Sequence, residues 1–217
     1  KVFAESLFAE RGVEWITGTH VQRVEDGKVF YETLDGENHE LSFDFAMLLP
    51  PFAGVGLKAF AKTGEDITSQ VFAPSGFMKV DADYTGKKYE DWKASDWPKT
   101  YRSPKYENMY AVGIAFAPPH QISMPRTSKK GTLIAPSPPR TGMPSAIMGR
   151  NVALNIADLI AGHPEKATRV SSMSQMGAAC VASAGAHWWA GSADSMTMFH
   201  IVPDFETYPD YGRDLKF

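Results

Sequence analysis

The sequence predicts an α/β fold, with helices and strands mixed as α+β within these 217 residues. Three observations lead to this class. An amphipathic stretch of about twenty residues after Thr141-Gly142 predicts one long helix. Short β-rich segments separated by Asp-Gly turns predict an antiparallel meander. An apolar content of 43% and a charged content of 22% are ordinary for a globular protein with a real core.

The N-terminal part is expected to form a helix followed by a meander. Residues 1–11 have apolar side chains at helical spacing, and Gly12 follows as a C-cap glycine. The apolar run 45–49 predicts a strand buried on both faces. A helix, a meander and a buried strand predict the closing half of a nucleotide-type α/β domain. Short strands are expected before that run at 13–17, 20–25, 29–34 and 40–43, with a hairpin turn at Asp26-Gly27.

Residues 53–59 match the dinucleotide-binding pattern GxGxxA after a strand. We interpret them as a crossover loop, because Pro50 and Pro51 interrupt the tight strand-to-helix turn that the fingerprint needs. No second strand with an acidic end follows at the expected distance.

The rest of the chain combines irregular segments with one long helix. Trp92 and Trp97 are expected to cover an edge of the core. The loop 114–143 is rich in proline, and loops of this length are usually functional or mobile. The long helix is expected at 144–161, ending at Gly162. Further strands are predicted at 77–80, 108–113, 167–172, 179–183 and 196–202.

Composition excludes several classes of function. A formal net charge of -3 gives no electrostatic case for a nucleic-acid partner. The single cysteine, Cys180, excludes an internal disulfide framework and a cysteine-based zinc site, and the histidines lack metal-ligand spacing, so no metal is expected. No apolar run approaches a spanning helix. The chain starts without Met and has no clear terminating element, so we expect a fragment of a longer polypeptide that is itself soluble.

Two features indicate redox chemistry on a bound organic cofactor. One is the helix start at Thr141–Pro144, where backbone N–H groups and the positive end of the helix dipole can face an electron-rich group. Gly142 permits close approach of the backbone, and Pro144 suits the first helical turn. The other is the lone thiol of Cys180. The alternatives are an ordinary capped helix and a small buried cysteine.

The segment NMYAVG at 108–113 resembles the C-terminal flavin motif of the two-dinucleotide-domain disulfide oxidoreductases, in which a strand ends at Gly beside the ribityl chain. Most members continue with Asp, whereas this chain has Ile114. Further segments resemble sulfide:quinone oxidoreductase and follow one another in the order of that family: LLPPFAGVGLKAF (48–60), APPHQISMP (117–125), PPRTGMPSAIMGRNVALNI (138–156), MGAACVAS (176–183) and MTMFHIVPDFETYPDYGRD (196–214).

The resemblance implies a partial two-dinucleotide-binding-domain flavoprotein fold that lacks the N-terminal FAD fingerprint. Residues 1–52 would be the closing half of the NAD(P)-like domain. Residues 53–217 would be the C-terminal part of the FAD domain with the cysteine-bearing region. FAD is then expected in the parent enzyme and not in the isolated residues, which are expected to be inactive. Two further redox cysteines would precede Lys1, and membrane-binding helices would follow Phe217.

The resemblance also implies roles for individual residues. In this family sulfide is oxidised at a cysteine pair, and two electrons pass through the flavin to a quinone. Cys180 would be the downstream cysteine of the pair. The residues that would contact the flavin are Gly113, Ile114, Arg140, Thr141, Gly142 and Met143. The candidates for the quinone pocket are Pro118, Pro119, Ile122 and Phe217. His120 is expected to be a hydrogen-bonded loop histidine, with a proton relay as the alternative.

Three other hypotheses remain open at this point. The first is the flavoprotein subunit of a flavocytochrome c sulfide dehydrogenase, which passes electrons to a haem protein. The second is a membrane NADH dehydrogenase, which does not need Cys180. The third is a catalytically inert folded module that forms a homo-oligomer through exposed surfaces. Under the leading hypothesis of a sulfide:quinone oxidoreductase, the parent is a peripheral membrane protein whose partners are sulfide, a quinone and the membrane surface.

Overall fold

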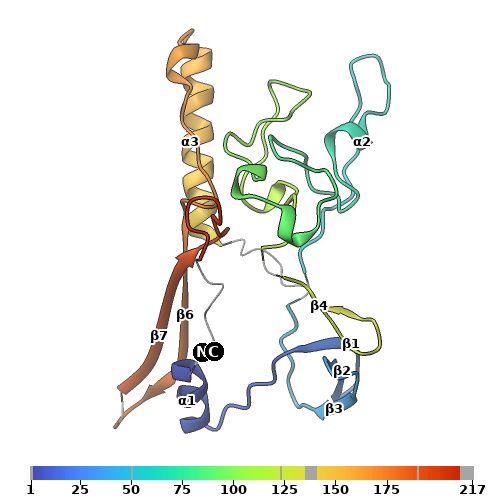
Figure 1. Cartoon of the computed structure of the whole chain (residues 1–217), viewed down its shortest axis with the longest axis vertical. Helices are drawn as coiled ribbons and strands as arrows, with labels where there is room; N and C mark the ends of the chain where they lie inside the picture. Colours follow the sequence, from blue (N-terminus) through green and yellow to red (C-terminus); the bar gives the residue numbers. More distant parts are fainter. Residues whose placement is uncertain (1, 50, 123, 135–140, 190, 211–217) are drawn as a thin grey trace.

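The computed structural model describes residues 2–49, 51–122, 124–134, 141–189 and 191–210. It has a mixed α/β composition with small antiparallel sheets (Figure 1). The α-helices are α1 (Val2–Glu10), α2 (Thr68–Val71) and α3 (Gly142–Ile160). The strands are β1 (Thr19–Glu25), β2 (Lys28–Thr33), β3 (Asn38–Ser42), β4 (Arg126–Thr127), β5 (Leu133–Ile134), β6 (Gly177–His187) and β7 (Gly191–His200). Short 3₁₀ helices lie at Tyr89–Asp91, Ala94–Asp96, Gly113–Ala115 and Pro164–Lys166.

The predicted meander is confirmed as a three-stranded antiparallel sheet with the order β1-β2-β3. Gly27 adopts a left-handed φ of 67° in the turn between β1 and β2, as the Asp-Gly pair predicted. The register of β1 shifts between Val21 and Arg23, which marks a bulge. The predicted helix at the N-terminus is also confirmed, and Gly12 follows it with a φ of 67°.

The hairpin of β4 and β5 is tied to this sheet by the buried carboxylate of Glu32, which is 1% exposed. Ser128 donates a short hydrogen bond to one carboxylate oxygen, and Thr132 donates to the other at 3.0 Å. From within the sheet, Gln22 donates to the same carboxylate at 2.9 Å. These bonds hold the pKa of Glu32 below its ordinary value, with the bond from Ser128 as the largest cause. The hairpin therefore depends on an ionised Glu32.

The hydrophobic core lies between α3 and the irregular region 59–122. Trp97 and Tyr101 are almost completely buried in it, and Trp92 is 5% exposed, so Trp92 and Trp97 are part of the core itself and not only a cover over its edge. Met148 and Val152 line the face of α3 that meets this core. Figure 1 shows the sheet β1–β3 at the end of the molecule away from this region, and the hairpin β6–β7 running from the lower end of α3 toward that same end.

Two predicted N-terminal strands are wrong. Residues 13–17 form no strand and pair with no described strand, and Trp15 instead packs its ring against Phe8 at 4.8 Å between centroids. The apolar run 45–49 also forms no strand, and its Phe45 and Leu49 are 84% and 83% exposed. An apolar run becomes buried only when other elements pack over it, and no described element packs over residues 45–49.

The strands predicted at 77–80, 108–113 and 167–172 are also absent. The first two make isolated bridges instead, in which Met78 pairs with Phe72 and Phe116, and Tyr110 pairs with Arg102. Each of these two segments lacks a continuous neighbouring strand among the described residues, so its bridge does not extend into a ladder. The predictions at 179–183 and 196–202 are confirmed within the longer strands β6 and β7, although β7 ends at His200.

The crossover-loop interpretation of residues 53–59 is confirmed. No helix follows Gly56, and Gly54 donates its backbone N–H to Ser75 O at 2.9 Å. A Cβ added at Gly54 would lie 2.2 Å from the backbone of Gly76. The glycine is therefore required by a close contact between two backbone segments. Among the described residues, no helix is both long and apolar enough to cross a bilayer.

Candidate functional site

The site is built around the N-terminus of α3. The helix begins at Gly142, two residues before the predicted start, so Gly142 and Met143 belong to its first turn instead of preceding it. Pro144 is tolerated inside this turn because the first N–H groups of a helix have no intrahelical partner. Thr141 is the N-cap residue, and its side chain makes no capping hydrogen bond. The first turn thus presents backbone N–H groups and the positive end of the helix dipole without a side-chain cap.

Gly113 packs directly on this first turn. Its φ is 62°, and a Cβ added there would lie 2.8 Å from Ser145 Oγ. Its backbone N–H donates to the sulfur of Met148 at 3.4 Å, one turn further along α3. Both constraints require glycine at this position. The structure therefore brings together the two segments that the sequence singled out, although 29 residues separate Gly113 from Gly142.

Beside this contact, several of the predicted residues face solvent. Gly113 and Pro144 are buried, whereas Ile114 is 48% exposed and Met143 is 47% exposed. Thr141 and Gly142 are exposed as well. Buried residues therefore fix the backbone, and the exposed residues beside them form an accessible surface at the start of α3.

A strained tyrosine connects this turn to the segment that leads into β6. Tyr101 is fully buried with a φ of 59°, a conformation that costs free energy for a non-glycine residue. Asp81 holds it there by accepting its N–H at 2.6 Å, and the Tyr101 hydroxyl donates to Ser171 O at 2.8 Å. Its carbonyl accepts the N–H of Ala111 at 3.0 Å, two residues before Gly113. Burial raises the pKa of this hydroxyl, which stays a neutral hydrogen-bond donor.

Cys180 lies in β6, where its backbone pairs with Thr197 of β7. The start of β6 is anchored in the core, since Met176 is 6% exposed and Ala178 is fully buried. Both residues belong to the same hydrophobic cluster as Met148 of α3. The strand that carries the cysteine is therefore fixed to the helix that carries the first-turn N–H groups.

The predicted quinone-pocket residues lie in the segment after Gly113–Ala115. Pro118, Pro119 and Ile122 are half-buried, and Ile122 packs against the core cluster. His120 lies between them, and its Nε2 is buried without a hydrogen-bond partner among the described residues. The expectation of a hydrogen-bonded loop histidine is therefore not supported at that nitrogen. Arg140 and Phe217 lie outside the described residues.

Comparison with known proteins identifies relatives of this chain. It is 30% identical over 174 residues to the sulfide-quinone reductase of Aquifex aeolicus, and the match covers 80% of this chain. The chain is homologous to a sulfide-quinone reductase. The crystal structure of sulfide:quinone oxidoreductase from Aquifex aeolicus matches it with a TM-score of 0.59 at 25% identity, over 91% of this chain. No protein-family model matches the chain.

The chain spans only part of the length of these relatives. The matched region is 34% of the curated relative and 40% of the solved chain. The fold of the chain is thus similar to the fold of one region of the solved oxidoreductase.

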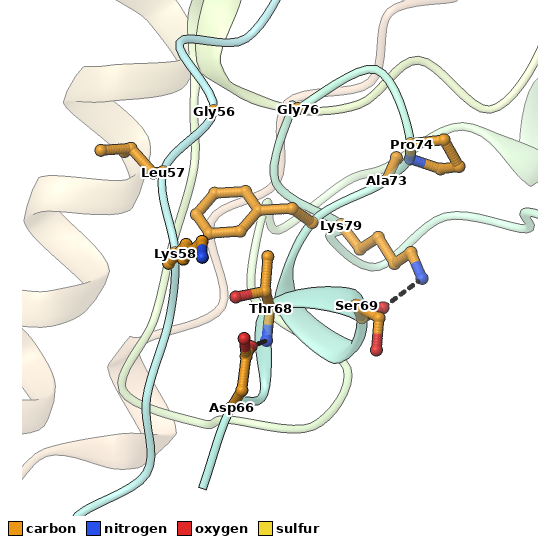
Figure 2. Close-up of a pocket in the computed structure, with 11 residues that line it drawn as sticks. Gly56, Leu57, Lys58, Asp66, Thr68, Ser69, Ala73, Pro74, Gly76 and Lys79 are labelled. Atoms are coloured by element: carbon orange, nitrogen blue, oxygen red, sulfur yellow. Dashed lines mark hydrogen bonds between the residues drawn. The ribbon is translucent and has the colours of Figure 1, made fainter. Parts of the chain in front are cut away.

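The chain also has a cavity of about 680 Å³, away from the residues predicted to contact the flavin and the quinone (Figure 2). The crossover loop forms one wall through Gly56, Leu57 and Lys58. The other wall comes from residues 66–79, where Lys79 Nζ donates to Ser69 O at 2.9 Å. Of the predicted flavin and quinone residues that the structure describes, none lines this cavity. A smaller cavity of about 220 Å³ lies beside Ser172, Ser174 and Asp204, and it does not include those residues either.

Several residues that position the site were not predicted from the sequence. Ser145 and Met148 contact Gly113, Asp81 holds Tyr101, and Tyr101 joins two core segments. The spacing of Met148 on the apolar face of the long helix predicts burial, but nothing local predicts its contact with a turn 35 residues earlier. The contacts of Asp81 are likewise set by the tertiary fold.

Proposed function

We propose that these residues form part of an FAD-dependent oxidoreductase that oxidises sulfide and reduces a quinone. The names of the two relatives supply the substrate class. The observation that carries the proposal is the packing of Gly113 on the first turn of α3. This contact supports the proposal, because one bound flavin would need the ribityl-contacting turn and the pyrimidine-facing helix start to lie side by side.

The described residues fit a flavin at this position. Gly142 is exposed, and a Cβ added there would meet no atom within 4 Å, so its backbone is open to a ligand. The uncapped N–H groups of the first turn are suited to the negative charge that a flavin pyrimidine gains on reduction. When bound, FAD would supply a two-electron carrier between sulfur and quinone. We propose Gly113, Ile114, Thr141, Gly142 and Met143 as its contacts, with Arg140 as a nearby positive charge.

Cys180 is proposed as the residue that carries the substrate sulfur. A thiolate attacks one sulfur of a persulfide or a disulfide, the existing S–S bond breaks, and the other sulfur leaves as its anion. A second cysteine elsewhere in the enzyme would complete the pair. In the net reaction, sulfide sulfur loses two electrons, and a quinone gains these electrons with two protons to become a quinol. The anchoring of β6 in the core supports this role, because it fixes the backbone of Cys180 relative to α3.

The remaining assignments extend this model. Pro118, Pro119 and Ile122 are proposed to shape an apolar quinone pocket together with Phe217. Residues 1–52 are proposed as part of an NAD(P)-like domain and residues 53–217 as part of the FAD domain. The complete enzyme is proposed to bind the membrane surface from which it takes its quinone, through segments beyond Phe217. Homo-oligomerisation is a further proposal for the complete enzyme.

The test uses the complete enzyme that carries these residues. Its visible spectrum is expected to show bound flavin, bleached by sulfide and restored by a quinone. A water-soluble quinone and a c-type cytochrome are compared as acceptors in parallel assays. Reduction of the quinone is expected, whereas exclusive reduction of the cytochrome would assign the enzyme to the flavocytochrome class. A flavin that sulfide leaves oxidised would contradict the proposal.

A further inference from the structure

The cavity of about 680 Å³ beside the crossover loop has walls that backbone contacts hold in place. At one end, Gly54 donates its N–H to Ser75 O at 2.9 Å, and a Cβ added at Gly76 would lie 2.9 Å from Gly54. At the other end, Ala59 donates its N–H to Thr68 Oγ1 at 3.0 Å. The cavity is therefore built into the fold, and its volume lies within the range of about 300–1,000 Å³ that is typical of small-molecule sites.

The lining of this cavity has more positive than negative charge. It includes the two lysines Lys58 and Lys79 but a single carboxylate, that of Asp66. Lys79 Nζ donates to Ser69 O at 2.9 Å, which leaves two of its three N–H donors for other partners. The ammonium group of Lys58, an exposed residue of the crossover loop, forms no ion pair or hydrogen bond with another described residue. An anionic ligand would therefore find a cation that the fold does not already use.

The carboxylate of Asp66 adds a hydrogen-bond acceptor to the lining. It accepts the backbone N–H of Thr68 at 2.8 Å. Hydrogen bonds from Thr68, and to a smaller extent the charge of Lys58, hold the pKa of Asp66 below its ordinary value. The carboxylate is therefore ionised, and its remaining lone pairs can accept a hydroxyl group of a ligand.

Apolar side chains complete the lining, and they favour a ligand with a ring over a bare anion. These side chains belong to Leu57, Phe72, Ala73 and Pro74. Phe72 is half-buried and packs against the core cluster, so the core holds its ring at the edge of the cavity. A planar ring of a ligand can pack against such an aromatic side chain. An inorganic anion alone would leave this apolar wall in contact with water.

We propose that this cavity binds a nucleoside monophosphate, a ligand that combines a phosphate, ribose hydroxyls and an aromatic base. Lys58 pairs with the phosphate, and Lys79 adds to the positive potential of the cavity. Asp66 accepts a ribose hydroxyl, and the base lies against the apolar wall. The site goes beyond the proposed function, because it needs neither FAD nor the thiol of Cys180.

The test is calorimetric titration of the 217-residue chain with adenosine monophosphate. Adenosine and inorganic phosphate are titrated in parallel, and each is expected to bind about tenfold more weakly or worse, because each meets only one part of the lining. Binding of adenosine monophosphate is expected to weaken as the salt concentration rises, because Lys58 is exposed to solvent.

Lys58→Ala is expected to weaken this binding about tenfold, whereas Lys58→Arg keeps the charge and is expected to retain most of the affinity. Lys62→Ala is the matched control, since it removes the same charge from an exposed position outside the lining, and it is expected to leave the affinity unchanged. Thermal unfolding of each variant checks that its fold is retained.

The proposal is overturned if the parent chain does not bind adenosine monophosphate or if inorganic phosphate binds as tightly. It is also overturned if Lys58→Ala retains the affinity of the parent, because the nucleotide would then bind elsewhere, such as at the start of α3. A loss of affinity in Lys62→Ala equal to that in Lys58→Ala would contradict it as well, since the attraction would then come from the general charge of the loop.

Discussion

At the scale of single residues, the candidate site depends on a glycine and a tyrosine in left-handed conformations. Gly113 occupies a position where both its φ of 62° and the nearby Ser145 exclude a side chain. Tyr101 tolerates a φ of 59° because Asp81 accepts its N–H and the core encloses its ring. Both residues belong to the segments that position the turn against α3, so the local strain serves the geometry of the site.

The replacement Gly113→Ala is expected to destabilise the chain by about 2 kcal/mol or more, because it adds a left-handed alanine to a steric conflict with Ser145. In the complete enzyme it is also expected to weaken flavin binding. Gly149→Ala is the matched control in α3, where an added Cβ meets no atom within 4 Å. It is expected to stabilise the helix by about 0.5–1 kcal/mol. Urea unfolding compares the two, and equal stabilities would contradict the packing described for Gly113.

At the scale of elements, local sequence signals predicted the meander, the long helix and the strands of the C-terminal hairpin. The Asp26-Gly27 turn and the helical spacing after Thr141 act over a few residues, so they can be recognised in isolation. The run 45–49 could not be predicted correctly, because its burial depends on elements that cover it. Most of the candidate site divides in the same way between local sequence signals and tertiary contacts. The helix start was recognisable, whereas the contacts of Gly113 with Ser145 and Met148 are tertiary.

The β4–β5 hairpin gives a prediction for stability as a function of pH. Hydrogen bonds from Ser128, Thr132 and Gln22 lower the pKa of Glu32 in the folded chain, and Lys130 adds a favourable charge. A group with a depressed folded pKa contributes stability above its unfolded value of about 4.5, and that contribution is lost as the pH falls through the folded pKa. Stability is therefore expected to fall below about pH 4.5.

Glu32→Gln is expected to flatten this acid dependence and to lower stability at neutral pH. The exposed Glu40, which pairs with Lys28, provides the control Glu40→Gln, whose pH profile is expected to follow that of the parent. Urea unfolding between pH 7 and pH 3 measures both variants. If Glu32→Gln retained the acid dependence of the parent chain, Glu32 would not be the group that ties the hairpin to the sheet.

At the scale of the whole molecule, a small core fixes the site while large apolar side chains remain outside it. Phe45, Leu49 and Val55 are each more than 80% exposed, which is unusual for a stable monomer. The sequence also lacks a true dinucleotide fingerprint, since the GxGxxA match lies in a crossover loop. In the proposed function the described residues would form one side of a flavin site, and the described part of the chain contains no phosphate-binding loop of the kind that usually holds the cofactor.

The isolated 217 residues are therefore expected to purify without flavin absorbance and without sulfide-dependent quinone reduction. Absorbance near the flavin bands and a quinone-reduction assay check both statements. A yellow protein with tightly bound FAD would show that the surface at the start of α3 suffices for binding. The exposed apolar side chains predict concentration-dependent self-association of the same preparation, which analytical ultracentrifugation can detect.

The central claim is that Cys180 carries the substrate sulfur beside a flavin held at the N-terminus of α3. The most direct measurement is sulfide-dependent quinone reduction by the complete enzyme with Cys180→Ser, compared with Ser183→Ala on the same strand. Cys180→Ser is expected to lower turnover by about a hundredfold or more while flavin stays bound, and Ser183→Ala is expected to leave turnover near that of the parent. Turnover of Cys180→Ser at the parent rate would contradict the claim.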